Sequence, residues 1–214
     1  MINHTTTGES LVLASRSPRR AELLRAVGWQ FEAIAADIDE SLNSDEDAVD
    51  YVRRLAETKA QAVAEKSRGR LVLGADTTVV IGGEILGQPR DHDDARRMLR
   101  LLSGEWHEVI TGVALVRLGP NPTTIVDYET TRVHFADLSA EEIDWYVSTS
   151  EPMGKAGGYG IQGKAAPFID EIQGDYFNIV GLPIRLIYEL WGQANRELST
   201  DYIAQQGRNQ KPKT

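Results

Sequence analysis

Apolar runs and amphipathic stripes alternate along most of this 214-residue chain. Short apolar or alternating runs predict β-strands, whereas apolar residues at every third or fourth position predict helices. The expected strands lie near residues 11–15, 30–36, 71–81, 84–86, 106–118, 123–136 and 168–172. The expected helices lie at residues 18–27, about 46–66, 91–104, 139–147 and about 182–191. This alternation is typical of an α/β fold.

Turn and capping residues mark several of these boundaries. Gly82 and Gly83 suit a two-residue hairpin turn, and Ser139 with Glu142 has the spacing of a capping box. The breaker at residues 119–122 predicts a loop tip rather than a linker. The chain is long enough for one domain, or for two small lobes around a cleft. We expect a polar extension over residues 1–10, one domain over 11–192, and a polar tail over 193–214 that is disordered from residue 205.

Composition narrows the function classes. The chain is 41% hydrophobic and 26% charged, which is ordinary for a globular protein, and its net charge of -9 argues against nucleic-acid binding. It contains no cysteine, which excludes disulfides and thiol catalysis, and its four histidines lack paired metal-ligand spacing. Residues 1–10 do not resemble a secretory signal, and no apolar run approaches the length of a membrane span. We therefore expect a cytoplasmic protein that does not bind membranes.

The segment from residue 11 to residue 24 has the pattern of an anion site. It joins an apolar strand to an amphipathic helix through a basic turn, so unpaired amides at the helix start would face a ligand. Ser17 can cap the helix and Pro18 fits its first position. Arg19 and Arg20 add guanidinium groups that can grip phosphate. The alternative is a surface helix with exposed arginines.

Four charged residues, at three places in the sequence, could carry chemistry. Asp76 lies in an expected strand whose neighbours are apolar on both faces, so its carboxylate should be shielded, as a general base or a metal ligand would be. A carboxylate bound to backbone amides is the alternative. Lys59 falls within the apolar stripe of helix 46–66 and should point inward, towards a phosphate pocket or by snorkelling to the core edge. Asp39 and Glu40 could hold a divalent metal, or could be solvated loop charges.

The glycine-rich stretch at residues 158–164 matches two nucleotide motifs only superficially. No apolar strand precedes it, Ala165 lacks the hydroxyl of a phosphate loop, and Pro167 stands where a helix should be established. Its glycines could let backbone amides approach a ligand, while Tyr159 and Gln162 could contact a base. A plain surface turn is the alternative.

Several ordered blocks give the chain a resemblance to the Maf family of nucleoside triphosphate pyrophosphatases, over nearly its whole length. These blocks are Ser15 with Ser17-Pro-Arg-Arg20 and Glu22-Leu-Leu24, Gly74-Ala-Asp-Thr-Thr-Val-Val80, Leu102-Ser-Gly-Glu-Trp-His107, Thr111-Gly-Val113, Lys155-Ala-Gly-Gly-Tyr-Gly-Ile-Gln-Gly163 and Gly174-Asp-Tyr-Phe-Asn-Ile-Val-Gly-Leu-Pro183. The resemblance implies a Maf/inosine-triphosphatase-like α/β fold, in which helices flank a mixed twisted sheet and two lobes surround a central cleft. It also implies a homodimer.

The same resemblance implies hydrolysis of a nucleoside triphosphate to the monophosphate and pyrophosphate, with magnesium or manganese. It assigns catalysis to Asp76 and metal binding to Glu40 and Asp76. It assigns substrate binding to Ser15, Arg19, Arg20, Lys59, Thr77, Gln88, Lys155 and Gln162. The implied biological purpose is removal of non-canonical or surplus nucleotides, with a connection to cell division.

The substrate branch and one departure also rest on the resemblance. Arg19, Thr77 and Gln162 match the positions that distinguish the dTTP- and UTP-hydrolysing branch from the 7-methyl-GTP branch. Gln88 stands where the family usually carries a phosphate-binding lysine. Lower activity, a changed role for Lys155 or Lys164, and a non-catalytic relative are all compatible with that change. The rival functions are therefore a nucleotide-binding division regulator with little turnover and a 7-methyl-GTP pyrophosphatase.

Overall fold

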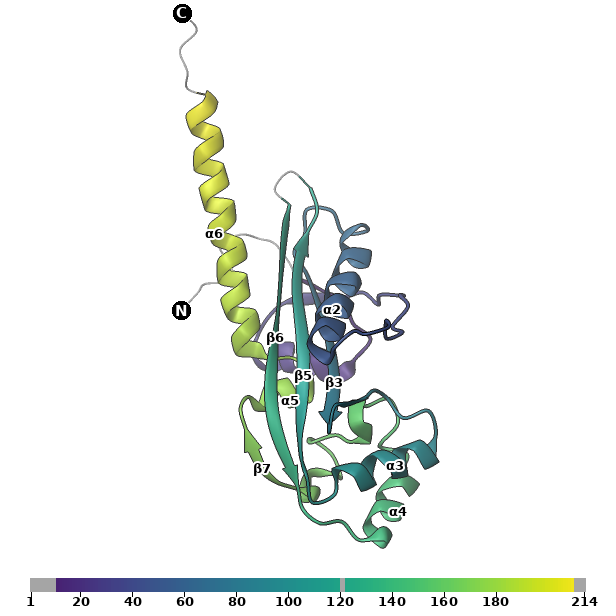
Figure 1. Ribbon diagram of the computed structural model, residues 1–214. Helices are drawn as coiled ribbons and strands as arrows, with labels where there is room; N and C mark the ends of the chain where they lie inside the picture. Colours follow the sequence, from purple (N-terminus) through teal and green to yellow (C-terminus); the bar gives the residue numbers. More distant parts are fainter. Residues whose placement is uncertain (1–10, 120–121, 210–214) are drawn as a thin grey trace, which may run out of the picture.

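The computed structural model describes residues 11–119 and 122–209, with side chains described as far as residue 196. One seven-stranded mixed sheet runs through it in the order β2-β1-β3-β5-β6-β7, and β4 pairs with β3 (Figure 1). The strands are β1 (Leu11–Leu13), β2 (Phe31–Ala33), β3 (Val72–Ile81), β4 (Glu84–Leu86), β5 (Trp106–Arg117), β6 (Thr123–Phe135) and β7 (Ile169–Gln173). The pairs β1–β2 and β1–β3 are parallel and the other pairs are antiparallel, so the expected mixed sheet is confirmed.

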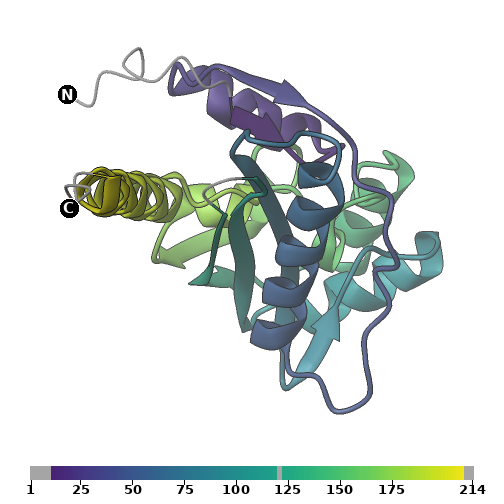
Figure 2. The same cartoon turned by 90° about the horizontal axis from the view of Figure 1, so that it is seen from above.

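Helices cover both faces of this sheet. They are α1 (Pro18–Ala26), α2 (Ala48–Ala64), α3 (His92–Leu102), α4 (Ala140–Ser148), α5 (Tyr176–Val180) and α6 (Ile184–Asn209), with short 3₁₀ turns at Ala156–Gly158 and Ala166–Phe168. Leu11 and Leu13 pack with α1 and α6, whereas Val12 between them packs with α2. The view from above shows α2 and α6 on opposite sides of the sheet (Figure 2). Strands β1 and β3 are therefore buried on both faces, and for β3 the apolar sequence predicted this burial.

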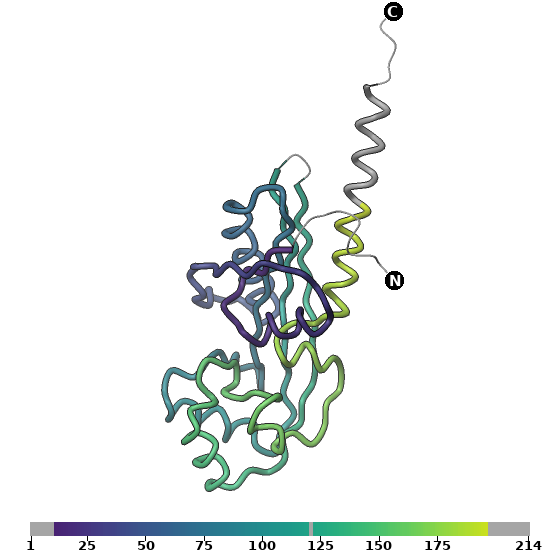
Figure 3. The backbone as a smooth tube through the Cα atoms, turned by 180° about the vertical axis from the view of Figure 1, so that it is seen from behind, coloured from purple at the N-terminus to yellow at the C-terminus, as the bar shows by residue number. Residues whose placement is uncertain are grey.

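The molecule has two lobes that share the long strands β3, β5 and β6. One lobe carries β1, β2, α1, α2 and α6, and the other carries α3, α4 and the 3₁₀ turns (Figures 1 and 3). The second lobe has its own apolar core, centred on Phe135, Tyr146 and Phe168. The predicted arrangement of two lobes is thus present, and the sheet continues through both.

Several local expectations differ from the structure. Ser17 precedes α1, but its side chain makes no capping hydrogen bond; its backbone N–H instead donates to Ser15 Oγ at 3.1 Å. The last helix does not end near Trp191 but continues to Asn209, so residues 205–209 are helical, and residues 210–214 lie outside the described part. The short helix α5 was not expected. The capping box of Ser139 and Glu142 is confirmed. Within the described residues, no helix combines the length and apolarity that a membrane crossing needs.

Two glycines let α2 lie directly on the centre of the sheet. A Cβ atom on Gly74 of β3 would lie 2.1 Å from the Ala56 carbonyl oxygen, and one on Gly112 of β5 would lie 2.3 Å from the Val52 carbonyl oxygen. Gly112 pairs across the strands with Asp76. The backbone of α2 therefore lies directly against the sheet beside Asp76.

We expect Gly74→Ala to lower the free energy of unfolding by about 3 kcal/mol, because the new methyl group would force α2 away from β3. Gly87→Ala is the matched control, since a Cβ atom there meets nothing within 4 Å and Gly87 has no positive φ. Urea unfolding measures both variants. Equal stability of the two variants would contradict the close approach of α2.

His107 lies buried in the core of the second lobe. Its ring packs edge-on against Phe135 and Tyr159, and its Nε2 atom lies 2.9 Å from the Tyr159 hydroxyl. Burial lowers the pKa of His107 to about 4. The imidazole is therefore neutral at physiological pH.

This burial predicts a pH-dependent stability term. Because the folded-state pKa lies below the unfolded value of about 6.5, the term is fully present above that pH and is lost as the pH falls towards about 4. Relative to His107→Gln, the wild-type protein should lose about 2 kcal/mol of stability between pH 7 and pH 5. Urea unfolding at both pH values tests this, and a constant difference between the two proteins would exclude it.

Candidate active site

A single cavity of about 520 Å³ gathers the ends of several elements between the two lobes. Its walls come from the turn before α1, the loop at residues 36–40, the centre of β3 and the glycine-rich segment at residues 154–162. All the residues predicted for the site line it: Ser15, Arg19, Arg20, Glu40, Lys59, Asp76, Thr77, Gln88, Lys155 and Gln162. Residues that lie up to 147 positions apart in the sequence thus meet in one place.

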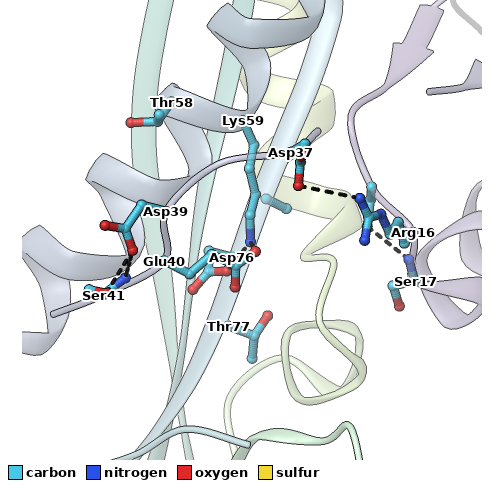
Figure 4. Close-up of polar contacts among 12 residues, drawn as sticks. Arg16, Ser17, Asp37, Asp39, Glu40, Ser41, Thr58, Lys59, Asp76 and Thr77 are labelled. Atoms are coloured by element: carbon cyan, nitrogen blue, oxygen red, sulfur yellow. Dashed lines mark hydrogen bonds and ion pairs between the residues drawn. The ribbon is translucent and has the colours of Figure 1, made fainter. Parts of the chain in front are cut away.

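Asp76, Lys59 and Glu40 form the ionic centre of the cavity (Figure 4). The Lys59 ammonium of α2 lies 2.6 Å from Asp76 Oδ1 and 2.9 Å from Glu40 Oε1. Asp76 and Lys59 are both buried, whereas the Glu40 side chain is half exposed. Lys59 therefore points inward into the pocket, which resolves the two alternatives that its sequence position left open.

Burial dominates the electrostatics of Asp76. It raises the pKa of the carboxyl group, the positive charges of Lys59 and Arg20 oppose that change, and Glu40 adds to it. A carboxylate with a raised pKa holds a proton more readily than one in water. Asp76 is thus the acidic group of the cavity best suited to accept one.

The Arg20 guanidinium donates most of its hydrogen bonds to other groups of the protein. Its Nε donates to the Gly181 carbonyl at 2.7 Å, and its Nη1 donates to the Ala75 carbonyl at 2.8 Å and to Ser15 Oγ at 3.4 Å. Its Nη2 donates to Thr77 Oγ1 at 2.9 Å. Four of its five N–H groups are therefore used within the chain, and Arg20 locks Ser15 and Thr77 in place more than it offers charge to a ligand.

Other cations of the cavity remain more available. The Arg19 side chain makes no hydrogen bond or ion pair with any residue in the described part of the chain, and partial burial lowers its pKa. Lys155 donates to the Glu151 carbonyl, and burial followed by the charge of Arg19 lowers its pKa. Arg16 faces Asp37 at 3.6 Å across the mouth, and both side chains are exposed. Arg19 and Arg16 can therefore turn towards an anion at little cost, whereas Lys155 would first have to leave the Glu151 carbonyl.

Two lining groups escaped the sequence interpretation. Arg16 and Asp37 carry no motif of their own, and only the meeting of their loops brings them to the cavity. The acidic pair at residues 39 and 40 also divides: Glu40 enters the cavity, while Asp39 is exposed and accepts hydrogen bonds from Ser41. Lys164 does not line the cavity.

The carboxylates of Glu40 and Asp76 could bind a divalent metal only if a bound ligand supplied further donor atoms. Within residues 11–119 and 122–209, no cluster of three or more acidic, histidine or cysteine side chains has metal-binding geometry. Magnesium commonly uses one or two carboxylates together with water and substrate phosphates. Two acidic groups on one side of a cationic cavity match that partial donor set.

The contrast between the adjacent arginines predicts different stabilities. Arg20→Lys should lower the free energy of unfolding by about 3 kcal/mol, because a single ammonium cannot satisfy the buried oxygens of Ala75, Gly181 and Thr77. Arg19→Lys is the matched control and should change stability by less than about 0.5 kcal/mol. Thermal and urea unfolding decide the point. A large loss of stability in Arg19→Lys, or no loss in Arg20→Lys, would contradict the structural role of Arg20.

The sequence is similar to one protein family over most of its length. Residues 10–194 match the family described as Maf-like protein. A dTTP/UTP pyrophosphatase of Symbiobacterium thermophilum is 50% identical over 185 residues, covering 86% of this chain and 94% of the relative. One from Hahella chejuensis is 54% identical over 179 residues, covering 81% of this chain and 87% of the relative.

A solved structure is also similar. It is the Ham1 protein of Staphylococcus aureus, with a TM-score of 0.49 and 15% identity over 86% of this chain and 100% of that chain. The sequence matches alone decide the membership, since one family spans most of the chain and the relatives are about half identical to it. The chain therefore belongs to the Maf-like protein family.

Proposed function

We propose that this protein is a nucleoside triphosphate pyrophosphatase that hydrolyses dTTP and UTP to the monophosphate and pyrophosphate. The observation that carries the proposal is the buried ion pair of Asp76 and Lys59 inside a cavity with further cations. That arrangement suits a substrate with several negative charges and a water that must lose a proton. The names of the relatives support the same substrates.

Asp76 acts as the general base in this mechanism. Its carboxylate accepts a proton from a water molecule, whose oxygen forms a bond to the α-phosphorus while the bond to the bridging α,β-oxygen breaks. Pyrophosphate then leaves with the electron pair of that bond. The raised pKa of Asp76 helps it take the proton. The reaction rate should therefore fall as the pH drops through that raised pKa.

Basic groups stabilise the charge that develops during this step. Lys59 is positioned beside Asp76, and Arg19 and Lys155 can approach the phosphate oxygens. Glu40 and Asp76 would hold a divalent cation, magnesium or manganese, which supplies further charge neutralisation when bound. Gln88 contributes an amide in place of a charge, so the remaining cations carry more of the phosphate binding.

Thr77 and Gln162 select the base in this proposal. The Thr77 hydroxyl is fixed by Arg20 at 2.9 Å and lies 3.0 Å from Thr111 Oγ1. Gln162 lies in the exposed wall of the cavity, where its amide can both donate to and accept from a pyrimidine edge. A cytoplasmic location and a homodimer belong to the same proposal and rest on the composition and on the family resemblance.

We expect Asp76→Asn to lower pyrophosphate release from dTTP and UTP by about 1000-fold, because asparagine cannot accept the proton. Nucleotide binding should persist. Glu57→Gln is the matched control, because Glu57 lies on the same helix as Lys59 but outside the cavity and bonds to Gln61. Pyrophosphate and orthophosphate are measured separately, with magnesium and with 7-methyl-GTP as a competing substrate.

Three outcomes would refute the proposal. Release of orthophosphate alone would exclude cleavage between the α- and β-phosphates. Tight binding without turnover in the wild-type protein would favour the regulator, and faster hydrolysis of 7-methyl-GTP would assign the other branch.

A further inference from the structure

The glycine-rich wall of the cavity is wrapped around the side chain of Glu151. Glu151 Oε1 accepts a hydrogen bond from the Lys164 backbone N–H at 2.8 Å and another from the Tyr146 hydroxyl at 3.3 Å. At the other end of the segment, the Lys155 ammonium donates to the Glu151 carbonyl. Lys155 and Lys164, which lie near the two ends of the glycine-rich segment, are therefore both bound to Glu151.

Tyr146 adds a third point of attachment. Its side chain is fully buried in the core of the second lobe, so the position of its hydroxyl is fixed by α4. That hydroxyl accepts a hydrogen bond from the Gly160 backbone N–H at 3.3 Å, in the middle of the segment. The Glu151 backbone carbonyl thus holds the start of the segment, the Tyr146 hydroxyl holds its middle and the Glu151 carboxylate holds its end. We call the side chains of Tyr146 and Glu151 the clamp.

The segment fits the clamp closely. A Cβ atom on Gly163 would lie 2.0 Å from Glu151 Oε1, and one on Gly160 would lie 2.8 Å from the Lys155 side chain. Gly157 and Gly158 have positive φ values of 66° and 72°. A chain this rich in glycine has many conformations to choose from when nothing holds it. The clamp is what selects one of them.

The clamp itself stands outside the cavity. Glu151 and Tyr146 do not line it, whereas Tyr159, Ile161 and Gln162 of the clamped segment do. The ionic centre is independent of the segment, because Lys59 bonds only to Asp76 and Glu40 among the contacts described. Loosening the clamp would therefore displace the wall that carries Gln162 and leave Asp76, Lys59 and Glu40 in place.

We propose that Glu151, together with Tyr146, is a positioning residue that sets which base the cavity accepts. The two side chains do so by fixing the backbone of the segment that carries Gln162. This inference rests on the proposed function, since it assigns base recognition to Gln162. The carboxylate serves as a hydrogen-bond acceptor for the segment and takes no part in proton transfer. Glutamine at this position keeps an acceptor oxygen, whereas alanine removes it.

The test compares Glu151→Ala, Glu151→Gln and Tyr146→Phe, using kcat and KM for dTTP, UTP and dCTP. Glu151→Ala should raise KM for dTTP about tenfold, lower the preference for dTTP over dCTP about tenfold, and leave kcat within about threefold. Glu151→Gln should restore wild-type values to within about threefold. Tyr146→Phe should change KM and preference in the same direction, less strongly. Glu141→Ala, an exposed carboxylate on α4, is the matched control.

A loss of kcat with unchanged KM and unchanged preference would overturn the proposal, and so would a folded Glu151→Ala variant that behaves as wild type. Thermal unfolding shows whether each variant is folded, and Tyr146→Phe decides the question if Glu151→Ala does not fold. Equal effects of alanine and glutamine at position 151 would also count against an acceptor role.

Calorimetric binding of non-hydrolysable dTTP and dCTP analogues separates this inference from the proposed function. If the wild-type protein binds the dTTP analogue preferentially but releases no pyrophosphate, the proposed function fails, and the clamp is still tested by the binding preference of the variants. If the wild-type protein binds both analogues equally, the clamp has no selectivity to set and the inference fails.

Discussion

The buried ion pair between Asp76 and Lys59 joins the centre of the sheet to α2, and the arrangement of the cavity follows from it. Two opposite charges withdrawn from water are costly, and removing one partner leaves the other uncompensated at about 3–5 kcal/mol. The pair exists because α2 lies so close to β3 and β5, which Gly74 and Gly112 allow. The same residues that complete the core thus place a proton acceptor and a cation beside each other. Stability and chemistry are coupled at this point, and neither can be altered alone.

The cations of the cavity serve two different ends. Arg20 donates most of its hydrogen bonds to backbone carbonyls and side-chain hydroxyls of three separate segments, and it therefore has a structural role. Arg19, its neighbour in sequence, lies about 100° further back around the helix and keeps its guanidinium free of the chain. Because they lie on different sides of the helix, Arg20 is a structural group and Arg19 faces the ligand site. The glycine-rich wall also separates structural from ligand-facing residues, because Tyr146 and Glu151 support it without lining the cavity.

Local patterns predicted most of the helices and strands, whereas most of the cavity residues were predicted from the resemblance to the Maf family. Apolar residues on both faces identified β3 as a central strand, and the position of Lys59 within an apolar stripe indicated its inward direction. Other features depend on contacts between distant segments and leave no local signal. The partner of Arg20 at Gly181 lies 161 residues away, and Ser17 resembles a cap although its side chain makes no such bond. Glu40 and Asp39 have the same chemistry, and only the path of their loop sends one into the cavity and the other into water.

The strands shared by the two lobes constrain how this protein can move. Strand β5 has 12 residues and β6 has 13, so each spans roughly 40 Å at the usual rise per residue and passes through both lobes without interruption. The ladder that pairs them from Trp106 to Arg117 therefore continues across the boundary between the lobes. A change in the relative orientation of the two lobes would therefore have to twist or bend this shared sheet, because no loop hinge separates the lobes along β5 and β6.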